Sequence, residues 1–194
     1  LLTDTIHATG LAASLREALD SWTKPLAEHH SSKVLLDLAL TLAIGGEHAS
    51  DADLLRCEPD LFGEVASAPT ISRMLTTLAE DAPAVIEAIS NARRAARERA
   101  WALAGEHSPA AGASAKSPLV IDLAATLIKV HSEKEQAAPT FKRGFGYHPR
   151  CAFLDHGSEG TGEPPAIHLR PGNAGSNTAA DHITVTKAAL AQLP

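Results

Sequence analysis

The sequence predicts a chain of mixed α+β or α/β class, in which a helical region is followed by three strands and a closing helix. Three observations carry this prediction. Apolar residues recur at helical spacing up to about residue 105, a stretch rich in Ala, Ser, Gly and Pro follows, and short apolar runs bounded by turn residues begin near Pro118. We therefore predict a helical domain over residues 1–106, a linker over 107–117 and a strand-rich domain over 118–194.

The composition is that of an ordinary globular protein of 194 residues, with 44% hydrophobic and 21% charged residues. No apolar run reaches the roughly 18 residues of a membrane span. Cys57 and Cys151 lie far apart and form neither a disulfide framework nor a zinc site by themselves. These features disfavour a secreted disulfide-rich fold, a membrane protein and a zinc finger, so we expect a cytoplasmic chain with reduced thiols.

Each helix of the first region is predicted from an apolar stripe and a stop signal. The predicted helices are 11–22, 33–44, 51–56, a segment beginning near Pro69, and 81–103. Gly45 and Gly46 end the second helix, and Ser50 is the expected N-cap of the third. Residues expected to face inward in the last two helices are Ile71, Met74, Leu75, Leu78, Val85, Ile86, Ile89, Ala92, Ala96 and Ala100.

Strand patterns follow the small-residue stretch. The expected strands are 118–123, which 125–130 can prolong, 145–154 with an irregular stretch around Pro149, and 166–170 after a turn-rich segment at 157–165. Thr178 is the expected cap of the closing helix, with Asp181 as its capping-box partner. Its inner face is expected to hold Ile183, Thr186, Ala189, Leu190 and Leu193. We predict an antiparallel meander with this helix on one sheet face.

Several runs in residues 118–194 carry a family resemblance. An acidic residue in the first strand, two more strands and then a helix is how a ribonuclease-H-like core begins. The runs LVIDLAATL (119–127), HSEKE (131–135), FKRGFGYHP (141–149) and LRPGNAGSNT (169–178) resemble the DDE transposases of bacterial insertion sequences. The group they resemble is transposase DDE domain group 1. The helical half resembles it more loosely, through 34–46 and 69–73.

The resemblance implies a function in DNA cleavage and strand transfer. In that family two Asp and one Glu hold two divalent cations, Mg²⁺ or Mn²⁺, for phosphodiester displacement. The implied partners are DNA, as element ends and target, and further copies of the chain. Asp122 is the candidate catalytic and metal-binding residue, and a structural role for this carboxylate is the alternative. The family's leading carboxylate, two residues before the threonine, is Ala124 here.

The chain ends at Pro194, where the strand with the second Asp is expected. The resemblance therefore implies an N-terminal fragment that is inactive alone and binds no metal by itself. The alternative is a non-catalytic DNA-binding module or a decayed remnant. An in-frame downstream continuation with the missing acids favours the first interpretation, and a stop codon favours the second.

Three groups of residues are candidates for DNA contact, although the net charge is -6. Each group also has an alternative interpretation, as an ordinary solvated surface or as packing. The first group, Lys142 and Arg143 with Lys129 and Arg150 nearby, is expected to meet phosphates. The second, Arg93 and Arg97 with Arg94 and Arg99, is the densest basic cluster. The third, Thr70, Ser72 and Arg73, resembles the start of a recognition helix.

Overall fold

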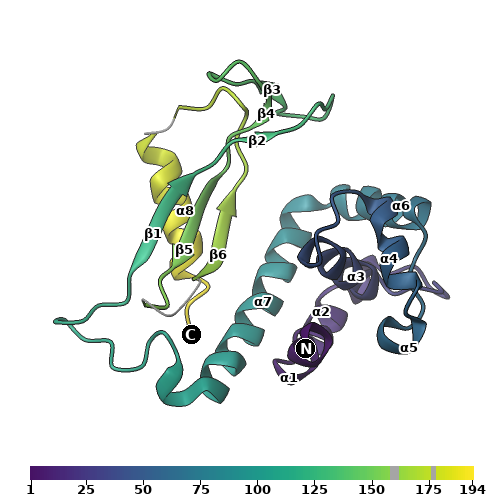
Figure 1. Ribbon diagram of the computed structural model, residues 1–194, viewed down its shortest axis with the longest axis horizontal. Helices are drawn as coiled ribbons and strands as arrows, with labels where there is room; N and C mark the ends of the chain where they lie inside the picture. Colours follow the sequence, from purple (N-terminus) through teal and green to yellow (C-terminus); the bar gives the residue numbers. More distant parts are fainter. Residues whose placement is uncertain (158–161, 176–177) are drawn as a thin grey trace. The chain divides into compact units, whose positions relative to one another are not determined.

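The computed structural model describes residues 1–157, 162–175 and 178–194. Its chain forms two units, Leu1–Ala100 and Trp101–Leu193. The first is helical, and the second contains two small antiparallel sheets and a helix (Figure 1). This division falls within the last long helix rather than in 107–117, and separate folding of the two parts stays a prediction.

The helical unit consists of α-helices with short 3₁₀ turns between them. Most begin and end close to the expected residues, but α1 and α5 have no counterpart among the predicted helices. The elements are α1 (Leu2–Ala8), α2 (Leu11–Ala18), η1 (Asp20–Trp22), α3 (Ser31–Ala43), η2 (Ala49–Ala52), α4 (Asp53–Arg56), α5 (Pro59–Phe62), α6 (Ala68–Ala79), α7 (Ala82–Ala104) and η3 (Gly105–His107).

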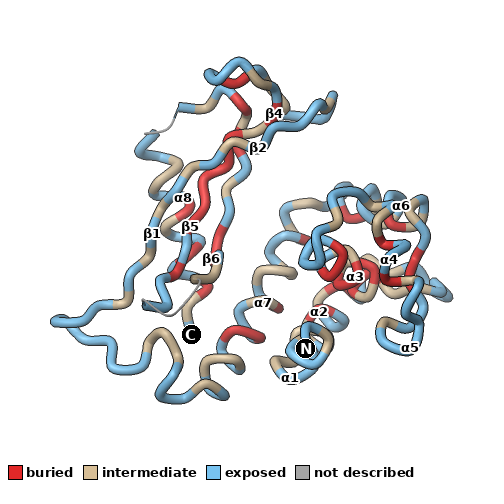
Figure 2. The backbone as a smooth tube through the Cα atoms, in the orientation of Figure 1, coloured by how far each residue is buried: buried red, intermediate tan, exposed pale blue. Residues whose placement is uncertain are grey.

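The core of the helical unit surrounds α3 (Figure 2). Leu55 and Ile71 are fully buried there, and Leu19 is fully buried beside α6 and α7. Aliphatic side chains of this kind contribute about 1.5–3 kcal/mol each when fully buried. The helical unit is therefore held mainly by apolar packing.

Two inward assignments in this unit are wrong. Ile86 is 63% exposed and Leu75 is 41% exposed. Ile86 lies about 100° around the helix from Val85, outside the stripe that α7 buries, and Leu75 lies at the edge of the α6 stripe. The expected cap Ser50 is also wrong: η2 begins after His48, which forms a capping box with Asp51.

The second unit contains two three-stranded sheets. One has the order β1–β5–β6 and the other β2–β4–β3, and every pair is antiparallel. The fold class is therefore α+β, and the α/β alternative does not hold for the described residues. The elements are β1 (Ile121–Ala125), β2 (Ile128–Lys129), β3 (Ala138–Pro139), β4 (Phe145–Tyr147), β5 (Arg150–Leu154), β6 (Glu163–His168) and α8 (Ala179–Leu190).

The larger sheet is the expected meander, with the smaller sheet inserted between β1 and β5. Residues 121–130 form two strands in different sheets instead of one prolonged strand. Pro149 separates β4 from β5, where an irregular stretch was predicted. β3 was missed because two residues that include a proline carry no strand pattern. Residues 158–161 of the expected turn lie outside the described residues.

Helix α8 packs on one face of β5 and β6, through the expected Ala189 but not through the expected Ile183 and Leu190. Val185 and Ala189 are buried against Ala152 and Ala166, whereas Ile183 and Leu190 are each 55% exposed. These small residues allow the helix and sheet to approach closely. Apolar residues lie all around α8, so periodicity does not select the buried face. Thr178 is the N-cap residue of the helix as expected, but its side chain forms no capping hydrogen bond with the helix backbone.

Candidate functional site

Asp122 lies in the middle of β1, on the sheet face opposite α8. Ile121 and Leu123 point to the α8 side, and side chains alternate along a strand. The register partner of Asp122 is Phe153, and Ala124 on the same face is paired with Cys151. The Asp122 side chain is exposed, and β1 forms one edge of its sheet. Asp122 is thus accessible on the face that α8 does not cover, and among the described residues its strand lies at the edge of the sheet.

The residues near Asp122 do not fit a pair of divalent cations. In the described part of the chain, no group of three or more His, Cys, Asp or Glu side chains could hold a metal ion. Ala124, its neighbour on the same face, supplies no ligand. Mg²⁺ prefers six oxygen ligands at near-octahedral geometry, which a single carboxylate does not provide. Asp122 is therefore at most one ligand of a larger site.

Lys142 and Arg143 lie on a hairpin loop between β3 and β4 and are both exposed. Within the described residues neither forms an ion pair with a carboxylate. Lys129 lies beneath this loop, because a Cβ added at Gly144 would be 3.7 Å from its Cγ. Arg150 is different: it is 3% exposed and its Nη1 lies 2.6 Å from His182 Nε2. Arg150 is therefore not the surface residue that the sequence suggested.

Thr70, Ser72 and Arg73 lie together near the N-terminal end of α6. Arg73 donates a hydrogen bond from Nη2 to Thr70 Oγ1 at 2.9 Å, and Ser72 is exposed. The opposite side of α6 is fixed by Ile71, which is fully buried. The element before α6 is α5, a single turn of four residues, instead of the full first helix of a helix-turn-helix. A role in base contact stays a prediction.

The arginines of α7 do not all face solvent. Arg94 and Arg99 are exposed and Arg93 is half-buried, but Arg97 is only 8% exposed. The i, i+4 spacing places Arg93 and Arg97 on one helix face, and that face is not a solvated one. The expectation of an exposed Arg93–Arg97 pair is therefore wrong, which leaves Arg94 and Arg99 as the exposed members of this cluster.

The sequence interpretation missed a buried polar cluster between the sheet and α8, which we call the Arg170 cluster. Arg170 is 2% exposed; its Nε donates to the carbonyl of His148 at 3.0 Å and its Nη1 to the carbonyl of Gly175 and to Asp181 Oδ2, both at 2.8 Å. The arginine lowers the pKa of Asp181. The available signal was an arginine directly after the apolar run of β6.

Two glycines allow close backbone contacts at the smaller sheet, Gly146 between β4 and β2 and Gly172 between the chain that follows β6 and this sheet. A Cβ at Gly146, whose φ is 145°, would overlap the carbonyl oxygen of Ile128. A Cβ at Gly172 would overlap the carbonyl oxygens of Ala138 and Gly146. Only glycine fits at these positions. The runs 141–149 and 169–175 therefore interlock, whereas Ser176 and Asn177 of the second run lie outside the described residues.

Comparison with protein families places these interlocking runs in one known domain. The transposase DDE domain group 1 matches residues 1–194. The chain belongs to this family. The match includes the helical unit, which resembled the family only loosely by its motifs. Comparisons with curated proteins and with solved structures gave no match.

Membership in the transposase family has two direct consequences. Transposases act on DNA, and DDE transposases generally use divalent metal ions. Among the described residues, no helix combines the length and the apolar character that crossing a membrane requires. Because transposases act on DNA, the exposed cations of the β3–β4 loop, Lys142 and Arg143, are candidates for contact with it.

Proposed function

We propose that residues 1–194 bind DNA during transposition and supply the opening strands of a ribonuclease-H-like catalytic core. The family match over both units carries this proposal. The meander β1–β5–β6 followed by α8 supports it, because three strands and then a helix form the beginning of such a core.

Asp122 is the residue of the described chain that we assign to this catalytic core. It is exposed on the open sheet face, and β1 presents an edge whose backbone groups can pair with another strand. In the family the strand after the helix carries the second acidic residue. A strand pairing with β1 would bring such a residue beside Asp122, and the two carboxylates would then share a metal site.

By themselves, we propose, residues 1–194 bind DNA without cleaving it. One accessible carboxylate does not hold two cations against the hydration shell that Mg²⁺ retains. DNA binding needs no metal, since Lys142 and Arg143 can neutralise phosphates directly. The second candidate function, a purely DNA-binding module, is favoured by Ala124, which stands where the family carries its leading carboxylate.

A cleavage assay with the purified chain tests this proposal. The chain is mixed with end-labelled duplex carrying the element end, with Mg²⁺ or Mn²⁺, at several salt concentrations. We expect binding that weakens as salt increases, with no nicking, and equal binding by Asp122→Asn. Nicking that is lost in Asp122→Asn would contradict the non-cleaving assignment. Failure to bind DNA even at low salt would overturn the proposed function.

The same sample tests the predicted self-association. Transposition joins two element ends, so we expect a homo-oligomer. Sedimentation of the chain with and without DNA measures its mass. A monomer under both conditions would contradict this part of the proposal.

A further inference from the structure

The loop between β3 and β4, Thr140–Gly144, is held rigidly at its base. Thr140 N donates to the Gly144 carbonyl at 2.9 Å, and Gly144 N donates to Thr140 Oγ1 at 3.1 Å. Arg143 N donates to the Thr140 carbonyl at 3.0 Å. The backbone of Arg143 has a φ of 58°, which residues other than glycine rarely adopt. The loop therefore presents its outer side chains from a fixed turn.

Phe141 is presented outward on this turn instead of being buried. Its side chain is 66% exposed, and its ring centroid lies 5.7 Å from that of His148 at a tilt of 56°. His148 is buried, with Nδ1 2.8 Å from the carbonyl of Ala174. A fixed imidazole thus contacts the phenyl ring on one side, and most of the ring stays in water. An exposed apolar residue alone is ordinary; here it is held in place.

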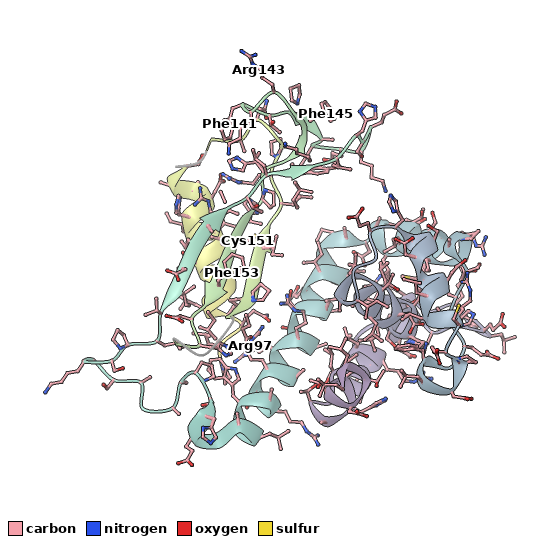
Figure 3. All side chains as sticks on the ribbon, viewed as in Figure 1. Arg97, Phe141, Arg143, Phe145, Cys151 and Phe153 are labelled. Atoms are coloured by element: carbon pink, nitrogen blue, oxygen red, sulfur yellow. The ribbon has the colours of Figure 1, made fainter. Side chains whose placement is uncertain are left out.

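The surroundings of Phe141 are cationic. The Lys142 Nζ lies 5.9 Å from the Phe141 ring centroid, and Arg143 lies at the outer end of the loop (Figure 3). The sequence has no Asp or Glu between Glu135 and Asp155. Acidic residues do occur on the preceding segment, at Glu133 and Glu135, where the chain connects β2 to β3. The loop itself therefore combines an aromatic ring with two positive charges and no negative one.

We propose that Phe141 stacks on a DNA base that has left its duplex stack, while Lys142 and Arg143 hold the neighbouring phosphates. This inference deepens the proposed function and rests on it. Every base has a flat apolar face that an aromatic ring can cover, and the flanking phosphates match the two cations. Such a pair of contacts favours DNA with an opened or unpaired base over a fully paired duplex.

The test measures the affinity of the full chain for two fluorescent duplexes that differ only by one unpaired thymine. Stacking of one base on an aromatic side chain corresponds to about a tenfold gain in affinity. We expect the chain to bind the bulged duplex about tenfold more tightly, and Phe141→Ala to lose this preference. Phe141→Trp, which keeps an aromatic face, should retain it. Phe153→Ala is the matched control, since Phe153 is also partly exposed but lies in β5.

The cations provide the second arm of the experiment. Lys142→Ala combined with Arg143→Ala should weaken binding to both duplexes equally and reduce the salt dependence, because phosphate contacts carry no base information. Binding of both duplexes with no preference, or a preference that survives Phe141→Ala, would overturn the stacking role alone. Failure to bind either duplex would overturn the proposed function and the stacking role with it. Circular dichroism of each variant checks that the fold is kept.

Discussion

Each unit of the chain contains a buried ion pair, and the two pairs are built in opposite ways. In the helical unit the carboxylate is the buried partner: Asp37 is 2% exposed and accepts from Lys33 Nζ at 2.7 and 2.6 Å. In the sheet unit the cation is the buried partner: Arg170 is 2% exposed and donates to Asp181 at the rim. The buried group carries most of the cost of leaving water.

This difference reverses the direction of the pKa shifts. Burial raises the pKa of Asp37, and Lys33 offsets only part of that effect. The hydrogen bond from Arg170 lowers the pKa of Asp181. The same pairing of a carboxylate and a cation therefore opposes stability at neutral pH through one aspartate and supports it through the other. The identity of the buried partner decides the sign.

Removal of the lysine from the helical pair should have the largest effect. Lys33→Met leaves the buried Asp37 carboxylate without a cation, which we expect to cost about 3 kcal/mol at neutral pH. Without Lys33 the pKa of Asp37 in the folded state rises further. The variant therefore regains part of its stability as the pH falls through this pKa, because Asp37 then becomes neutral. Urea unfolding at several pH values measures this. Lys24→Met, at an exposed position, is the control. Equal urea midpoints for Lys33→Met and Lys24→Met would contradict the prediction.

Removal of the buried cation from the sheet pair should have a smaller effect. Arg170→Met leaves the carbonyls of His148 and Gly175 without their donor, at a cost of about 2 kcal/mol. The lowered pKa of Asp181 stabilises the fold above about pH 4, and this contribution is lost as the pH falls through the folded pKa. The difference between wild type and Arg170→Met should therefore shrink in acid because wild type loses stability, whereas for Lys33→Met the difference shrinks because the variant regains stability. Lys187→Met is the exposed control.

A milder change in the same pair should be weaker still. Asp181→Asn keeps an oxygen that accepts from Arg170 but removes the negative charge. We expect a loss of stability smaller than that of Arg170→Met, and none at a pH where Asp181 is protonated in wild type. Unfolding curves of the two proteins should converge in acid. A constant difference across the whole pH range would show that the charge does not matter.

Local patterns predicted the helices well because their signals are local. Gly45, with a φ of 97°, ends α3 as expected, and Pro69 lies in the first turn of α6. Such signals set the bounds of a helix and the width of its apolar stripe. They do not decide which face of α8 meets the sheet, since Ile183 and Val185 are equally apolar.

The candidate site was predictable only where a local turn pattern decides which side chains face water. Lys142 and Arg143 are exposed, as a basic pair in a turn suggests. The pairing of Arg170 with Asp181 joins residues that follow no helical or strand spacing, so only the folded chain reveals it. Arg97 shows the same limit: spacing placed it on the face of Arg93 but did not say that this side chain is buried.

The smallest expected effect is that of the Lys33–Asp37 ion pair on the stability of the sheet unit. We predict that limited proteolysis of the folded chain cuts first within 107–117, a segment without strand or helix beyond the η3 turn at its start. Lys33→Met should speed digestion of the helical part and leave the survival of the 118–194 fragment unchanged, because the destabilised contacts lie in the other unit. Fragments are identified by mass spectrometry. A first cut within 34–44 or 167–170 would show that the predicted boundary is wrong. Faster loss of both parts in Lys33→Met would show that the two units unfold as one.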